Sequence, residues 1–263
     1  MPAFAAKNPT TVLRDAVKKT EAQKTAHAQL KINISGAASP TNPDTNFTQT
    51  GVFDLKKPNG VWKVDNGTDP YNVRLVNGVY YFGYIGLPAT QPWVRSPVTE
   101  YSQYFGIQDG IGDGTTILES LNLLNATTGT VKKLGSTKVR DISTTEYRAT
   151  VDIEKFFKNR DYFSDTAKAQ MRQFFGEKFP LLVWIDSKGR ARRIAYQVDL
   201  SKQSNSVLGA AGKVTLSLEF WDFGTKLNVT APPQDQTMTF DQYQNLGGNS
   251  QPNQQPVEKP IPA

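Results

Sequence analysis

The sequence predicts an α+β fold, in which a strongly curved antiparallel sheet carries a few amphipathic helices against one face. Short runs of alternating apolar residues recur along the chain, separated by turns rich in Gly, Asn and Pro. Two apolar stripes at helical spacing interrupt these runs. Of the 263 residues, 38% are hydrophobic, which is enough apolar material for a core.

The first predicted element is a helix. Asn8 is a suitable N-cap, Pro9 suits the first helical position, and the helical spacing continues to about His27. From Ala28 the period becomes two, which predicts strands at residues 30–34, 47–55 and 61–64. The clearest hairpin joins residues 71–76 to 79–85, because Asn77-Gly78 readily supplies the two positive φ angles of a type I′ turn.

Two further helices are expected. Asp113 can cap one helix, whose stripe consists of Ile117, Leu118, Leu121 and Leu124. Ser164 can cap the other, whose stripe of Ala167, Met171, Phe174 and Phe175 ends before Gly176. Between the two helices, residues 128–134 and 139–151 are predicted to be strands.

A second hairpin and an exit strand complete the predicted sheet. Residues 182–186 alternate before the turn Ser187-Lys188-Gly189, and the alternation resumes at residues 194–198. Residues 216–224 form the exit strand, which leaves the sheet through Pro232-Pro233 because proline lacks the N–H donor that pairing needs. Residues 8–240 are therefore predicted to form one domain. Residues 241–263, dominated by Gln, Asn, Gly and Pro, are predicted to be a disordered tail.

Two segments carry a family resemblance. The hairpin Trp184-Ile-Asp-Ser-Lys-Gly-Arg-Ala-Arg-Arg193 and the segment Asp222-Phe-Gly224, followed by Val229-Thr-Ala-Pro-Pro233, resemble the actinobacterial lipoproteins of the LppX/LprG type in the LolA-like superfamily. The resemblance covers roughly residues 10–235. It implies a half-open barrel whose concave face is covered by helices, with an apolar cavity between sheet and helices that takes acyl chains.

The function implied by this resemblance is non-enzymatic binding and transport of lipid or glycolipid at the bacterial cell envelope, by a monomer. The residues expected to line the cavity are Ile117, Leu118, Leu121, Leu124, Met171, Phe174, Phe175, Tyr80, Phe82 and Trp184. One alternative is an envelope sensory or scaffold protein that binds a protein partner with the same concave surface. A carbohydrate-binding module is a weaker alternative, based on the many aromatic residues.

Location follows from the same resemblance. The protein is expected to be exported to the cell envelope. Members of the family carry a lipidated cysteine at the mature N-terminus, and this sequence contains no cysteine. The two alternatives are an anchored protein whose lipidated cysteine is missing from this sequence, and a secreted protein.

The dense basic cluster of the chain is Lys188, Arg190, Arg192 and Arg193, in a sequence of net charge +6. One interpretation is a charged hairpin that protects a sheet edge. The other is a surface that rests on an anionic membrane, where each basic residue contributes on the order of 1 kcal/mol. The remaining basic residues are scattered among 24 acidic ones, which argues against nucleic acid as a partner.

The sequence offers few groups for catalysis. With no cysteine and the single histidine His27, it cannot form a thiolate site, a His-rich zinc site or a Cys–His pair. Asp109, Asp113 and Glu119 could supply the paired carboxylates of a glycosidase, although a loop with an N-cap aspartate explains them more simply. Neither an enzyme nor a metal or cofactor is expected.

Overall fold

The computed structural model describes residues 9–35, 45–67, 69–84, 86–97, 114–158, 160, 163, 165–199 and 212–246. Its strands are Thr25–Ser35 (β1), Thr45–Asp54 (β2), Gly60–Asp65 (β3), Tyr71–Val76 (β4), Val79–Gly83 (β5), Trp93–Pro97 (β6), Thr127–Val139 (β7), Ile142–Asp152 (β8), Lys178–Asp186 (β9), Ala191–Asp199 (β10), Lys213–Trp221 (β11) and Thr237–Thr239 (β12). Its helices are Pro9–Glu21 (α1), Gly114–Asn122 (α3), Leu123–Ala126 (η1), Ile153–Phe157 (α4), Asp165–Phe175 (α5), Gln234–Gln236 (η3) and Phe240–Asn245 (α6).

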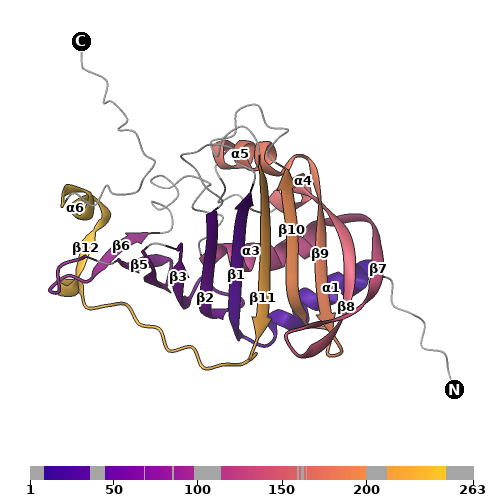
Figure 1. Ribbon diagram of the computed structural model, residues 1–263, viewed down its shortest axis with the longest axis horizontal. Helices are drawn as coiled ribbons and strands as arrows, with labels where there is room; N and C mark the ends of the chain where they lie inside the picture. Colours follow the sequence, from indigo (N-terminus) through magenta and orange to yellow (C-terminus); the bar gives the residue numbers. More distant parts are fainter. Residues whose placement is uncertain are drawn as a thin grey trace, which may run out of the picture.

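All twelve of these strands belong to one sheet, in the order β12-β6-β5-β4-β3-β2-β1-β11-β10-β9-β8-β7 (Figure 1). Neighbouring strands are antiparallel except β12, which runs parallel to β6. The order begins at β12 and ends at β7, so the described sheet is open and does not close into a barrel. The α+β class and the large antiparallel sheet predicted from the sequence are confirmed.

Turn chemistry explains the hairpins. Asn77 and Gly78 have φ angles of 51° and 79°, and they join β4 to β5 as predicted for an Asn-Gly type I′ turn. The predicted strand boundaries at residues 134 and 139 are wrong, because β7 continues to Val139 and the chain turns at Arg140, which has a φ of 51°. Gly135 lies at a shift in the β7–β8 register, and β7 continues through this irregularity.

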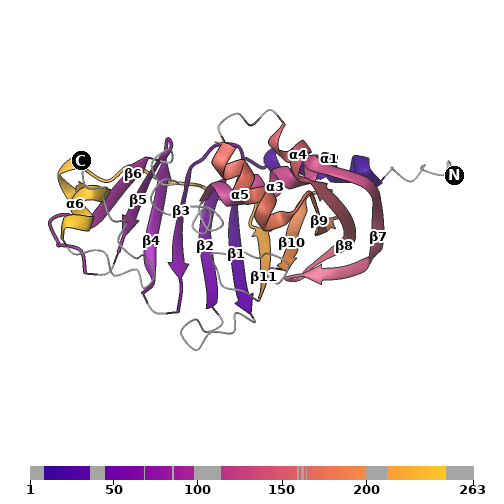
Figure 2. The same cartoon turned by 90° about the horizontal axis from the view of Figure 1, so that it is seen from above.

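Helices α1, α3, α4 and α5 lie over the half of the sheet that runs from β1 to β7, whereas α6 lies beside β6 and β12 at the other end (Figure 2). Helix α1 contacts both β7 and β10, and η1 contacts α1, α4 and β8. Helix α1 ends at Glu21, earlier than the predicted His27, because Lys24 adopts a φ of 68° and β1 already begins at Thr25. None of the described helices is long and apolar enough to cross a membrane.

The C-terminal part of the sheet differs from the prediction. Strand β11 ends at Trp221 rather than at Gly224, and an extended segment of residues 222–233, here called the strap, runs along the sheet to η3 and β12 (Figure 1). Helix α6 follows, so the predicted tail boundary at residue 241 is wrong. The side chain of Tyr243 stacks on Tyr84, with ring centroids 5.3 Å apart, which ties α6 to the sheet. Residues 247–263 of the expected tail lie outside the described residues.

Candidate functional site

One face of the sheet, here called the inner face, carries the buried apolar side chains. On β1 the buried residues are Ala26, Ala28, Leu30 and Ile32, and the register places Phe220, Leu218 and Leu216 of β11 opposite the last three. The same cluster of buried residues extends from Met238 of β12 to Val151 of β8 and includes Leu13 of α1. The inner face is therefore a continuous apolar surface that spans almost the whole sheet.

An aromatic ladder crosses the inner face from β2 to α6. Its rings are Phe53, Trp62, Tyr80, Phe82, Tyr84 and Tyr243, and successive centroids are 5.1, 6.3, 5.5, 5.6 and 5.3 Å apart. Aromatic pairs at such spacings stabilise each other beyond their buried area. Tyr80 and Phe82 were identified from the sequence, whereas Phe53, Trp62 and Tyr243 are distant in the chain and were missed.

A second aromatic cluster connects α5 to β9 and β10. Phe175 lies 4.7 Å from Phe179 and 5.8 Å from Tyr196 between ring centroids, and Phe174 contacts Phe175 edge to face at 4.9 Å. Burial raises the pKa of the Tyr196 phenol above its ordinary value, and the nearby Ser120 hydroxyl of α3 opposes the shift only in part. Both α3 and α5 thus contact inner-face residues in a dry environment.

The structure brings most of the predicted lining residues to this apolar core. Ile117, Leu121, Leu124, Tyr80 and Phe82 are buried in it, Met171, Phe174 and Phe175 pack against it half-buried, and Leu118 is half-buried on α3. Placement in the core is a structural finding, and contact with a ligand stays a prediction for each of them.

Trp184 does not belong to this set, so its prediction as a lining residue is wrong. It alternates with Val183 and Ile185, whose side chains join the core cluster, and therefore lies on the opposite, outer face. There the guanidinium carbon of Arg193 lies 5.2 Å from the Trp184 ring centroid, and Arg193 also pairs with Glu219. The contact with Arg193, which lies opposite on β10, accounts for the burial of Trp184.

Gln49 and Trp62 each place a buried polar atom on the inner face. Gln49 of β2 is 2% exposed and Trp62 of β3 is 3% exposed. Neither Gln49 Oε1 nor Trp62 Nε1 has a hydrogen-bond partner in the structure. Buried polar groups are hydrogen-bonded in most proteins, so these two atoms need an explanation.

The predicted basic surface is largely occupied by internal ion pairs. Asp186 lies at the end of β9 with its side chain 2% exposed, and its Oδ2 accepts hydrogen bonds from Arg190 Nε at 2.9 Å and Arg192 Nε at 2.8 Å. Both guanidinium groups also face the ring of Phe223, at 4.6 and 4.7 Å. Since Arg193 pairs with Glu219, Lys188 alone of the four predicted residues has an exposed side chain without an ion pair to a described residue.

The Asp186 carboxylate organises the whole hairpin turn. Its Oδ1 also accepts hydrogen bonds from the backbone N–H groups of Lys188 and Arg190, each at 3.0 Å. Burial alone would raise the pKa of this carboxyl, but the hydrogen bonds from Arg190 and Arg192 outweigh burial and hold the pKa below its ordinary value. The arrangement is an ionised, fully bonded structural centre.

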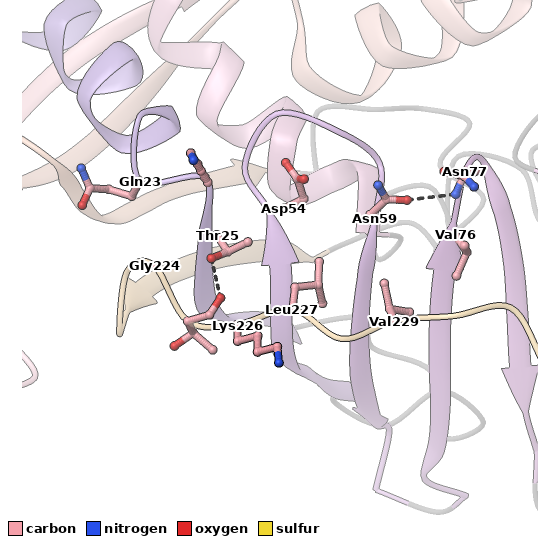
Figure 3. A pocket seen from close by; sticks show the side chains of 12 residues that line it. Gln23, Thr25, Asp54, Asn59, Val76, Asn77, Gly224, Lys226, Leu227 and Val229 are labelled. Carbon is pink, nitrogen blue, oxygen red and sulfur yellow. Dashed lines mark hydrogen bonds between the residues drawn. The ribbon is translucent and has the colours of Figure 1, made fainter.

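A groove of about 570 Å³ lies between the strap and the turns at one end of β1–β4 (Figure 3). Thr25 Oγ1 donates to the Thr225 carbonyl at 2.5 Å, and Asn59 Oδ1 accepts from the backbone N–H of Asn77 at 2.9 Å. None of the predicted lining residues borders this groove. Its mixed lining, with Lys24, Asp54 and Leu227, contrasts with the apolar inner face.

Groups for catalysis are scattered in the described part of the chain. His27 stacks on Trp221 at 5.6 Å, and its Nδ1 lies 3.5 Å from Asp222 Oδ2 at the surface. Glu119 pairs with Arg160 at 3.2 Å, while Asp109 and Asp113 lie outside the described residues. The described residues contain no group of three or more His, Asp or Glu side chains that could hold a metal ion.

No protein-family model matches the sequence, and no curated protein matches it. Among solved structures, the chain is similar to LprF from Mycobacterium bovis, with 13% identity and a TM-score of 0.49 over 85% of this chain and 96% of that one. It is also similar to the lipoprotein LppX from Mycobacterium tuberculosis, with 14% identity and a TM-score of 0.44 over 84% of this chain and 98% of that one. A LolA superfamily protein from Nitrosomonas europaea has 11% sequence identity and a TM-score of 0.24, with 86% of this chain and 96% of that chain covered.

LprF and LppX are actinobacterial lipoproteins of the LolA-like fold, the group that the hairpin and the exit strand of this sequence resemble. At these identities and TM-scores, the likeness assigns neither a ligand nor a role to this chain.

Proposed function

We propose that the protein binds the acyl chains of a lipid or glycolipid on the inner face, between the sheet and the helices, and carries them at the bacterial cell envelope without catalysis. The observation that supports this most directly is the continuous apolar inner face of an open sheet, which includes the aromatic ladder. An open sheet has to cover such a face with helices or with a ligand. The proposal includes export and attachment to the envelope.

The energetics favour such a ligand. Burial of apolar surface contributes roughly 25 cal/mol per Å², so several hundred Å² of alkyl chain would supply about 10 kcal/mol before ordering costs. Helix α5 supplies side chains that adapt to irregular alkyl shapes, namely Met171 and Phe174, both half-buried.

Native mass spectrometry of gently purified protein tests the proposal. We expect masses of bound lipid that disappear on extraction with organic solvent, and we expect added long-chain fatty acids to bind again. A protein that is free of lipid after purification and takes up no fatty acid would contradict the proposal.

Replacing Phe174 by Trp should weaken fatty-acid binding by roughly tenfold, because the larger ring would exclude about two methylenes worth about 0.8 kcal/mol each. Phe174 is only half-buried, so the folded state can accept the change, whereas Leu121 is 1% exposed and a Trp there would overpack the core. The matched control is Tyr81→Trp, since the parity of β5 places Tyr81 on the outer face. Isothermal titration calorimetry with stearic acid measures both variants, and equal affinity in Phe174→Trp and the parent would remove Phe174 from the binding site.

The membrane contact in this proposal needs a surface other than Arg190 and Arg192. The edge strand β7 carries Lys132, Lys133 and Lys138, all exposed and without an ion pair to another described residue, and the exposed Leu134 lies among them. Lys132 also lies directly opposite Arg148 in the β7–β8 register. Unpaired basic residues beside an exposed apolar side chain suit an anionic lipid surface.

Changing Lys132 and Lys133 to Gln should lower binding to anionic vesicles by about 2 kcal/mol, or roughly 30-fold, at low salt. The control is the same change at Lys56 and Lys57, an exposed basic pair after β2. Sedimentation with phosphatidylglycerol and phosphatidylcholine vesicles measures the effect, which should shrink as salt rises. A defect of equal size in the control pair would show that only net charge matters and that β7 is not the contact.

A further inference from the structure

Gln49 and Trp62 lie close together on the inner face. In the β2–β3 register Gln49 is opposite Val64, and Trp62 is opposite Gly51, so their side chains are diagonal neighbours on one face. Diagonal neighbours in a sheet have Cα atoms about 7–8 Å apart, with the Cβ atoms somewhat closer. A single small polar group between the two side chains could therefore reach both of them.

The surroundings of the two polar atoms are apolar except for the buried hydroxyl of Tyr80. Leu30 of β1 and Val64 of β3 stand opposite Gln49, and both are at most 1% exposed. The rings of Phe53 and Tyr80 lie 5.1 and 6.3 Å from that of Trp62. A buried amide oxygen and a buried indole N–H without partners both destabilise a folded protein, so an aliphatic residue at position 49 would favour stability. Stability does not explain why a glutamine is here.

The two atoms are complementary to one chemical group. Gln49 Oε1 accepts a hydrogen bond and Trp62 Nε1–H donates one. A hydroxyl group can donate a hydrogen bond to Gln49 Oε1 and accept one from Trp62 Nε1–H. A carbonyl oxygen can only accept the bond from Trp62, and a methylene group can bond to neither atom. We infer that the apolar ligand carries a hydroxyl group along its hydrocarbon chain and that Gln49 and Trp62 bind this hydroxyl. This inference rests on the proposed function and specifies its ligand class as hydroxylated long-chain lipids.

Stearic acid and its positional hydroxy isomers, including 10- and 12-hydroxystearic acid, test the inference by calorimetry. We expect the protein to bind at least one isomer about tenfold or more tightly than stearic acid, because the unsubstituted chain leaves both polar atoms without partners. Gln49→Leu and Trp62→Phe should each remove most of this preference while stearic acid still binds. The free Gln49→Leu variant should also melt at a higher temperature than the parent, since it no longer buries an unpaired amide oxygen.

The matched control is Gln29→Leu, the same change on the neighbouring strand β1, where Gln29 is half-buried and bonded to Thr50 on the outer face. It should keep the preference for the hydroxylated chain. Equal binding of stearic acid and all hydroxy isomers by the parent would overturn the inference and leave the proposed function standing. A lower melting temperature of Gln49→Leu would also overturn it, because the amide would then be bonded to water in the free protein. Failure of every fatty acid to bind would refute the proposed function itself.

Discussion

Replacing Asp186 by Ala should lower the free energy of unfolding by about 3–5 kcal/mol, because it leaves two buried guanidinium groups without their counter-charge. Arg190 and Arg192 are both bonded to this carboxylate, with side chains 12% and 9% exposed. The variant also loses the acceptor for the turn N–H groups of Lys188 and Arg190. Urea unfolding followed by tryptophan fluorescence measures the change.

The effect should depend on pH in a defined direction. The folded-state pKa of Asp186 is held below its ordinary value, so its stabilising contribution is complete above the ordinary Asp pKa of about 4 and is lost as the pH falls through the lower folded-state pKa. The difference between parent and variant should therefore be large at neutral pH and shrink in strong acid.

Asp222→Asn serves as the control, because the Asp222 side chain is 67% exposed beside His27 and asparagine tolerates the φ of 44° at this position. Its effect should stay within about 0.5 kcal/mol. If the two aspartate variants lost equal stability at neutral pH, the buried ion-pair cluster would not be a major support of the hairpin.

Gly51→Ala is expected to destabilise the protein by about 3 kcal/mol or more, since the added methyl group overpacks a site enclosed by backbone. A Cβ at Gly51 would lie 2.1 Å from the Val61 carbonyl oxygen and 2.5 Å from Cα of Trp62. Backbone atoms cannot move aside as a flexible side chain can, so β2 and β3 would have to separate. The change should also displace Trp62, which differential scanning calorimetry and tryptophan emission would both register.

Gly135→Ala is the matched control on another strand of the same sheet. A Cβ at Gly135 meets no atom within 4 Å, so alanine there should be neutral or slightly stabilising through the unfolded state. Similar losses in both variants would mean that glycine matters for strand flexibility in general and that the contact at Gly51 is not decisive.

Local signals in the sequence predicted the elements that depend on local chemistry. The Asn77-Gly78 turn, the Pro9 start of α1 and the end of α5 before Gly176, which has a φ of 72°, all follow from backbone preferences of single residues. Short elements without such a signal were missed. Strand β12 contains three residues and pairs in parallel with β6, a contact that depends on the path of the strap.

The site was predicted unevenly for a related reason. Apolar helix stripes indicated that Leu121 and Leu124 are buried, because the helical period determines their face. Periodicity alone does not determine which face of a strand points to the core. Trp184 was therefore assigned to the inner face, although it lies on the outer face. The arginines of the hairpin were interpreted as a charged edge or a membrane-facing surface, because their charge is visible in the sequence. The fold of the turn, which brings Arg190 and Arg192 within hydrogen-bond distance of Asp186, is not.

The position of β11 between β1 and β10 determines when the sheet can be completed. Residues 25–97 supply six neighbouring strands, yet the free edge of β1 receives its partner only from residues 213–221, and the free edge of β6 only from residues 237–239. Such distant pairings give a high contact order, and folding of such sheets takes on the order of milliseconds to seconds. Until the end of the chain arrives, both edges present unpaired N–H and C=O groups to other chains. A chain interrupted before residue 213 should therefore aggregate through these edges, whereas the full chain covers them with its last strands.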